Sequence, residues 1–139
     1  MKKILFAFAF IAMVAIAPAQ TVIKPLMKGT TAYATITNTG TDSILVVLTQ
    51  GYKNISFQPK VTKISGTMTS NSKPQLYGSF DGNRYYTITG DTLHITNTST
   101  PLYTSWVKSS QDYKYYKVVW TGAGTMSAKL ECLFMGVTN

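Results

Sequence analysis

The chain has 139 residues and a formal net charge of +8, and 45% of its residues are hydrophobic. This length suits one hydrophobic core, so we expect a single domain. The lysines are spread along the chain and Arg84 is the only arginine, which argues against a nucleic-acid reader, because such proteins gather their charge and use arginine for bidentate contacts.

The first segment has the composition of an export signal. Met1–Lys3 is basic, Ile4–Ala17 is an apolar run of 14 residues, and Ala17-Pro18-Ala19 is a small-x-small site. These are the three parts of a secretory signal peptide, so residues 1–19 are predicted to form a hydrophobic leader helix, cleaved before Gln20. The protein is then exported to the periplasm or the medium, or is part of a virion. A retained membrane anchor is the alternative, although spanning a bilayer takes about 18 to 20 apolar residues.

The segment after the leader, residues 20–30, contains Pro25 and Gly29 and is expected to be an extended arm. It stays loose, packs along an edge strand or adds to a neighbouring subunit. Thr, Val, Ile and Tyr dominate residues 31–139, and helical spacing is missing there, so this part is predicted to be strands. The predicted strands are Thr31–Asn38, Ser43–Gln50, Asn54–Phe57, Val61–Met68, Pro74–Phe80, Arg84–Ile88, Thr92–Ile95, Leu102–Val107, Tyr113–Trp120 and Thr125–Met135.

Turn residues separate these strands at short intervals, which is typical of all-β sandwiches and barrels. We predict a single antiparallel β-sandwich of jelly-roll type over residues 31–139. The most apolar run, Ser43–Leu48, is expected to be a central strand covered on both faces, whereas the alternation over Met126–Phe134 indicates one solvated face. Asp81-Gly82 has the chemistry of a tight hairpin turn.

Few side chains suit catalysis or metal binding. His94 and Cys132 are the only histidine and cysteine, too few for a structural zinc site, and Cys132 falls on the apolar side of the last strand, where burial is expected. The aspartates at positions 42, 81, 91 and 112 lie at predicted turns, which their side chains stabilise. We therefore predict no enzymatic activity, no metal and no cofactor.

Tyrosine and tryptophan are concentrated in the second half of the chain. Because side chains alternate between the two faces of a strand, the rings cannot all enter one core. Exposed rings suit sugar stacking or a protein interface, and the alternative is that they form cross-strand pairs on a half-buried surface. The candidate surface or ligand contacts are Tyr77, Tyr85, Trp106, Tyr115 and Lys117.

Four motifs resemble a β-sandwich module of bacteriophage virion and prophage structural proteins. They are Gly66-Thr67, Gln75–Ile88 with its Gly-Ser-Phe-Asp-Gly hairpin, Tyr113–Trp120 and Gly122–Ser127. In that module an aromatic strand follows the hairpin, and a later aromatic-basic strand leads through a Gly-x-Gly turn into the last strand. The same hairpin is more weakly similar to discoidin-like, galactose-binding-like jelly rolls, which bind glycans or lipid head groups through loops at one end. This chain lacks their cysteine pair, and none of their ligand residues can be carried over.

The phage resemblance implies a non-enzymatic, virion-associated structural subunit, such as a head decoration or appendage protein. Its partners would be other structural subunits or further copies of itself. The leader and the tyrosines favour the alternative, an exported carbohydrate- or surface-binding module with glycans as partners. Neither function includes a nucleic acid, and a membrane is contacted only through an uncleaved leader.

Overall fold

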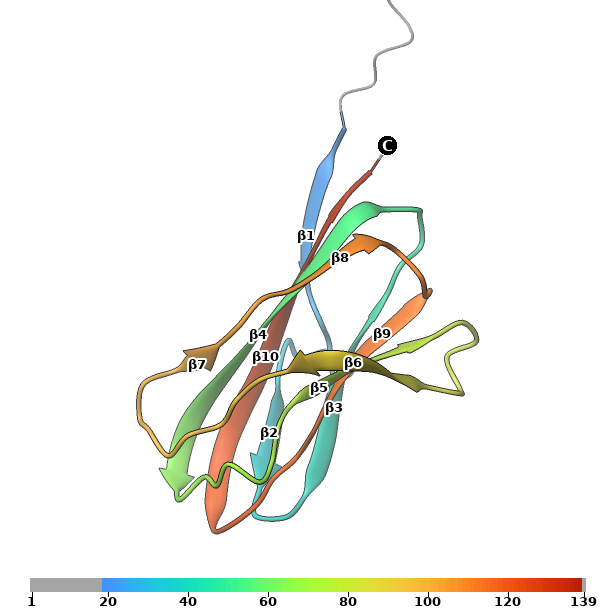
Figure 1. Ribbon diagram of the computed structural model, residues 1–139. Coiled ribbons are helices and arrows are strands. Elements are labelled where there is room, and N and C mark those ends of the chain that lie inside the picture. The colour runs from blue at the N-terminus through green and yellow to red at the C-terminus, as the bar shows by residue number, and fades with distance from the viewer. Residues whose placement is uncertain (1–18, 139) are drawn as a thin grey trace, which may run out of the picture.

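The computed structural model of this chain describes residues 19–138, and the predicted leader helix falls outside the described residues. All regular elements in this part are strands (Figure 1), so it contains no helix that would cross a membrane. The strands are β1 (Thr21–Pro25), β2 (Ala34–Thr37), β3 (Thr41–Val47), β4 (Lys53–Gly66), β5 (Gln75–Ser79), β6 (Tyr86–Thr92), β7 (Leu102–Tyr103), β8 (Trp106–Ser110), β9 (Tyr115–Thr121) and β10 (Met126–Val137). The all-β prediction is confirmed.

The strands pair into two antiparallel sheets that pack as a β-sandwich (Figure 1). In the first, called the β4–β10 sheet, β10 has β4 on one side and on the other β1 and β2, which pair with its two halves. β7 and β8 pair with the edge of β4 that faces away from β10. The second, called the β5–β9 sheet, has the order β3-β9-β5-β6. The two ends of the described chain meet where the Thr138 N–H donates to the Gln20 carbonyl at 3.0 Å.

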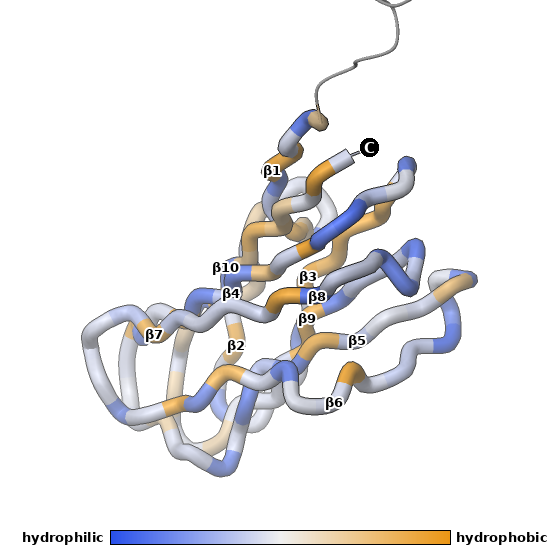
Figure 2. The backbone as a smooth tube through the Cα atoms, turned by 45° about the horizontal axis from the view of Figure 1, so that its top comes forward, coloured by the Kyte–Doolittle hydropathy of each residue, from blue (hydrophilic) through white to orange (hydrophobic). Residues whose placement is uncertain are grey.

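Alternate residues of the strands fill the space between the sheets. Aromatic rings join the two layers, since the ring centroids of Phe57 of β4 and Tyr116 of β9 are 4.9 Å apart. Within its own sheet, Phe57 lies 5.5 Å from Phe134 of β10. Figure 2 shows hydrophobic segments interspersed with hydrophilic ones along the strands, as expected where one face is buried. The buried side chains of β10 are Met126, Ala128, Leu130, Cys132 and Phe134, which confirms the predicted alternation.

One long strand replaces two predicted ones. The strand expected at Asn54–Phe57 and most of that expected at Val61–Met68 belong to β4, which continues through Pro59 and ends at Gly66. The Pro59 carbonyl accepts a hydrogen bond from the Thr104 N–H at 3.3 Å, on the side where β7 ends and β8 has not begun. The N and C=O of a strand residue point to the same side of the strand. The position where Pro59 lacks an N–H therefore faces the gap between β7 and β8, and no hydrogen bond between β4 and β10 is lost.

The prediction that Ser43–Leu48 is a central strand is wrong, because β3 is an edge strand of the β5–β9 sheet. Its free edge is covered by the predicted arm, which forms β1 along β10 and then crosses to β3. There Met27 and Leu45 exchange backbone hydrogen bonds of 2.7 and 2.8 Å. Of the three alternatives for residues 20–30, the structure thus shows packing along a strand. Cover on both faces is also wrong, because Ile44 and Val46 are buried but Leu45 is only half-buried and Val47 is 36% exposed on the other face. An apolar run does not show which face or edge other segments will cover.

The loop between β5 and β6 is longer than the predicted two-residue turn, because regular pairing stops at Gly78 and Tyr86. Asp81 organises this loop. Its carboxylate accepts hydrogen bonds from the N–H groups of Arg84 and Asn83, each at 2.9 Å, and from the Ser79 hydroxyl at 3.0 Å. These bonds hold the pKa of Asp81 well below its usual range, the Arg84 N–H having the largest effect. The role of Asp81 as a turn former is confirmed.

Asp91 does not lie in a turn as predicted, because it belongs to β6 and is largely buried. Its carboxylate lies 2.6 Å from the Lys108 ammonium of β8, so this ion pair links the two sheets. The strand predicted over Thr92–Ile95 is also absent, since β6 ends at Thr92. Leu93 and Ile95 nevertheless point into the core from irregular chain.

Candidate functional site

Most of the predicted contact residues come together on the outer face of the β5–β9 sheet. We call Tyr77, Tyr85, Tyr115 and Lys117 the tyrosine–lysine face. Lys117 of β9 is the register partner of Tyr77 of β5, and its ammonium lies 3.8 Å from the centroid of the Tyr85 ring. Burial raises the pKa of the Tyr85 phenol, and the nearby Tyr115 and Asp81 groups raise it further. The structure thus joins three segments of the chain into one cluster of rings around a lysine.

Trp106 does not belong to this surface, and its prediction as a surface contact is wrong. Its side chain is 4% exposed, and its indole N–H donates to the Thr92 carbonyl at 3.2 Å. Trp106 pairs with the buried Phe57 of β4, so the alternation along β8 turns Val107 outward instead. The sequence of β8 alone does not reveal which of its residues face inward, because the pairing with β4 sets this.

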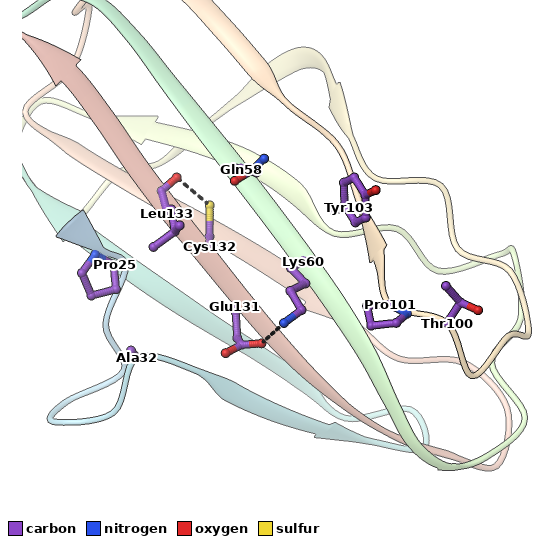
Figure 3. A pocket seen from close by; sticks show the side chains of 10 residues that line it. All are labelled: Pro25, Ala32, Gln58, Lys60, Thr100, Pro101, Tyr103, Glu131, Cys132 and Leu133. Carbon is purple, nitrogen blue, oxygen red and sulfur yellow. Dashed lines mark hydrogen bonds and ion pairs between the residues drawn. The ribbon is translucent and has the colours of Figure 1, made fainter. Parts of the chain in front are cut away.

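A groove of about 580 Å³ lies on the opposite side of the sandwich, on the outer face of the β4–β10 sheet (Figure 3). β4 contributes Gln58 and Lys60, and β10 contributes Glu131 and Leu133. Tyr103, at the end of β7, lies on the far side of β4 from β10 in Figure 3, and its side chain is 71% exposed. The groove therefore combines an open aromatic ring with charged groups.

The electrostatics of the groove centre on Glu131. Its carboxylate lies 3.0 Å from the Lys129 ammonium and 3.4 Å from that of Lys60. Burial raises the pKa of Glu131, but the hydrogen bond from Lys129 and the charges of both lysines outweigh it, so the pKa is below its usual value. Glu131 is thus ionised at neutral pH and offers acceptors next to the ammonium donors.

Sequence reasoning missed this groove because its residues are far apart in the chain. Lys60 and Glu131 are register partners on β4 and β10, and no local motif marks such a pair. Tyr103 was one of many tyrosines, and its exposure follows from the short pairing of β7 with β4. The only available signal was the alternation of charged with apolar residues along the last strand, which placed Glu131 on the solvated face.

His94 and Cys132 lie where the sequence placed them, whereas Asp42, predicted at a turn, belongs to β3. His94 is exposed between two buried residues, and burial raises the pKa of the Cys132 thiol, as expected of a core cysteine. Within residues 19–138, no three His, Cys, Asp or Glu side chains lie together as a possible metal site. The expectation of a non-enzymatic protein stays a prediction.

The chain matches no protein-family model and no curated protein sequence. Among solved structures it is similar to a CBM32 module of Clostridium perfringens in complex with GalNAc-β-1,3-galactose, with 15% identity, a TM-score of 0.45, and coverage of 82% of this chain and 94% of that one. For a CBM4 structure the identity is 16%, the TM-score 0.44 and the coverage 86% and 77%. For tailspike protein 4 of bacteriophage CBA120 the identity is 5%, the TM-score 0.49 and the coverage 86% and 18%. At these values the likeness concerns the fold alone.

Proposed function

We propose that this protein is an exported, non-catalytic module that binds a short oligosaccharide in the groove beside Tyr103. The observation that carries the proposal is the exposed Tyr103 ring in the same groove as the Lys60–Glu131 pair. A sugar ring has an apolar C–H face and a rim of hydroxyl groups. Tyrosine can cover the face, while a carboxylate and an ammonium accept from and donate to the hydroxyls.

The dimensions of the groove support this function. Its volume of about 580 Å³ lies within the range of roughly 300–1,000 Å³ that is usual for small-molecule sites. Pro101 and Leu133 add apolar lining, and Gln58 adds an amide with both donor and acceptor groups. All of these groups are held by strands or lie next to them, so little of the site has to be ordered when a ligand binds.

Replacing Tyr103 with alanine should weaken oligosaccharide binding about tenfold or more, because truncating an aromatic anchor costs about 1.4–2 kcal/mol or more. An array of immobilised neutral and acidic oligosaccharides identifies the best binder, and calorimetry with the full chain measures its dissociation constant. Tyr86→Ala is the matched control, since Tyr86 is an exposed tyrosine of the other sheet. Absence of any binding to the array, or equal affinity of the Tyr103→Ala variant, would contradict the proposal.

We also propose that the sandwich is a jelly roll. β1 and β2 occupy one position beside β10, and β7 and β8 occupy one position beside β4. If each of these pairs is counted as one strand, the fold has eight strands in two four-stranded sheets. The order β3-β9-β5-β6 of the second sheet places strands from early and late parts of the chain side by side. This interleaving is what a double Greek key produces.

A second candidate function is a structural subunit of a virion, favoured by an apolar row across the β4–β10 sheet. Ile23, Met135, Ser56 and Val107 are successive register partners on four strands. The exposed fractions of Ile23, Met135 and Val107 are 64%, 40% and 69%. A row of exposed apolar side chains on one face is typical of protein interfaces.

If this row mediates subunit packing, the full chain should self-associate, and Val107→Lys should return it to monomers because a lysine would be desolvated in the contact. Light scattering after size exclusion measures the mass of both proteins. Ile64→Lys is the control, since Ile64 is an equally exposed residue near the far end of β4. A wild-type monomer at all concentrations would contradict self-assembly through this face.

A further inference from the structure

We infer that the tyrosine–lysine face is a second binding site, for an acidic polysaccharide that carries carboxylate or sulfate groups. This face belongs to the β5–β9 sheet, so it lies on the opposite side of the sandwich from the groove. It does not depend on the proposed function of the groove. Two sites on opposite sides would let one molecule bridge two glycan chains.

The centre of this face carries a positive charge that has no ion-pair partner. Lys117 lies at its centre, and among residues 19–138 it forms no ion pair. Asp81 is close enough to raise the pKa of Tyr85, but its carboxylate accepts the hydrogen bonds of its own loop and pairs with Arg84. The outward residues of β5 and β9, at 75, 77, 79, 115, 117, 119 and 121, include no carboxylate. A cation without an ion-pair partner is complementary to an acidic ligand.

Rings surround this cation in a way that suits sugars. The Lys117 ammonium rests on one face of Tyr85 at 3.8 Å, which holds the long side chain in place by a cation–π contact. Tyr77 lies directly across from Lys117 on β5, and Tyr115 lies two residues away on the same face of β9. A sugar ring stacked on a tyrosine would therefore present its acidic substituent to Lys117.

The face is long enough for a polymer. It continues from Tyr77 into a shallow pocket of about 280 Å³ that is lined by Lys73 and Thr121 among others. From Tyr115 to Thr121, β9 advances about 20 Å at roughly 3.3 Å per residue. Lys117 and Lys73 thus lie at separate points on the same side of the sheet, an arrangement that fits repeated charges on a chain better than a single anion.

Nucleic acid is the competing polyanion, and the face suits it less well. Single strands are bound by free ring faces on which bases stack, together with a dense basic groove. Here Lys117 covers one face of Tyr85, and the only arginine, Arg84, is paired with Asp81 at 3.2 Å. The face therefore lacks the dense basic groove of a single-strand binder and is better suited to an acidic sugar chain.

Affinity electrophoresis of the full chain in gels that contain polygalacturonate tests the site. The wild-type protein should be retarded, less so as the salt concentration rises. Lys117→Gln should raise the dissociation constant about tenfold, since a charge-assisted hydrogen bond is lost. Lys53→Gln is the matched control, because it removes the same charge from β4 of the other sheet and should leave the retardation unchanged. Thermal melting of both variants checks that each is folded.

Three further results decide the outcome. Tyr115→Phe should bind normally because it keeps the ring, and Tyr115→Ala should not. Tyr103→Ala should retain full binding, which separates this site from the groove. No retardation of the wild type, an equal loss in the two lysine variants, or tighter binding of an oligothymidylate than of polygalacturonate would overturn the inference.

Discussion

Replacing Trp120 with alanine should lower the free energy of unfolding by about 3–5 kcal/mol, the usual range for removal of a buried large aromatic side chain. Trp120 has no exposed surface and is the largest fully buried residue of the described chain. Its indole N–H also donates to the Ser72 hydroxyl, which in turn donates to the Thr121 carbonyl. The substitution would therefore leave a cavity in the core near the end of β9 and remove a hydrogen-bond partner.

Urea denaturation followed by circular dichroism measures this loss. Ser72→Ala is the informative companion, because it removes the hydrogen bond and keeps the indole in place, and its expected cost is about 1–2 kcal/mol. Trp120→Phe supplies a value if the alanine variant does not fold, since it retains part of the ring volume. A Trp120→Ala variant no less stable than Ser72→Ala would show that burial of this ring contributes little.

Replacing Gly66 with alanine should destabilise the protein by about 3 kcal/mol, because left-handed backbone strain costs roughly 1–3 kcal/mol and overpacking a similar amount. Gly66 has a φ of +72°, and a Cβ there would lie 1.7 Å from the Thr125 carbonyl oxygen. It ends β4 opposite Met126, where β10 begins, and a bulge follows within two residues. No side chain can move aside to relieve this contact, since the obstacle is backbone.

The same denaturation experiment compares Gly66→Ala with Gly51→Ala. Gly51 is an exposed loop residue whose added Cβ would meet no atom within 4 Å. Its replacement should be neutral or stabilising by about 0.4–1 kcal/mol, through a lower entropy of the unfolded chain. Equal stability of the two variants would mean that the close approach of β4 and β10 at Gly66 is not maintained in solution.

Local sequence determined most of the strands and the inward-facing residues of the last one. The alternation over the last strand predicted the burial of Cys132 and the solvated position of Glu131, and the structure has both. Asp81 was predicted as a turn former, and its hydrogen bonds reach no further than three residues. These features depend on neighbours in the chain, so periodicity and turn chemistry were enough to find them.

Only the tertiary structure decided which side chains share a surface. Register across strands brought Lys60 to Glu131, turned Trp106 inward and put β3 at an edge. None of these follows from local pattern, because pairing between distant strands sets both the neighbours of a side chain and the face to which it points. The sequence alone thus determined an all-β chain rich in tyrosine. The pairing of its strands decided that some rings lie in the core, some surround Lys117, and Tyr103 stands open beside a charged groove.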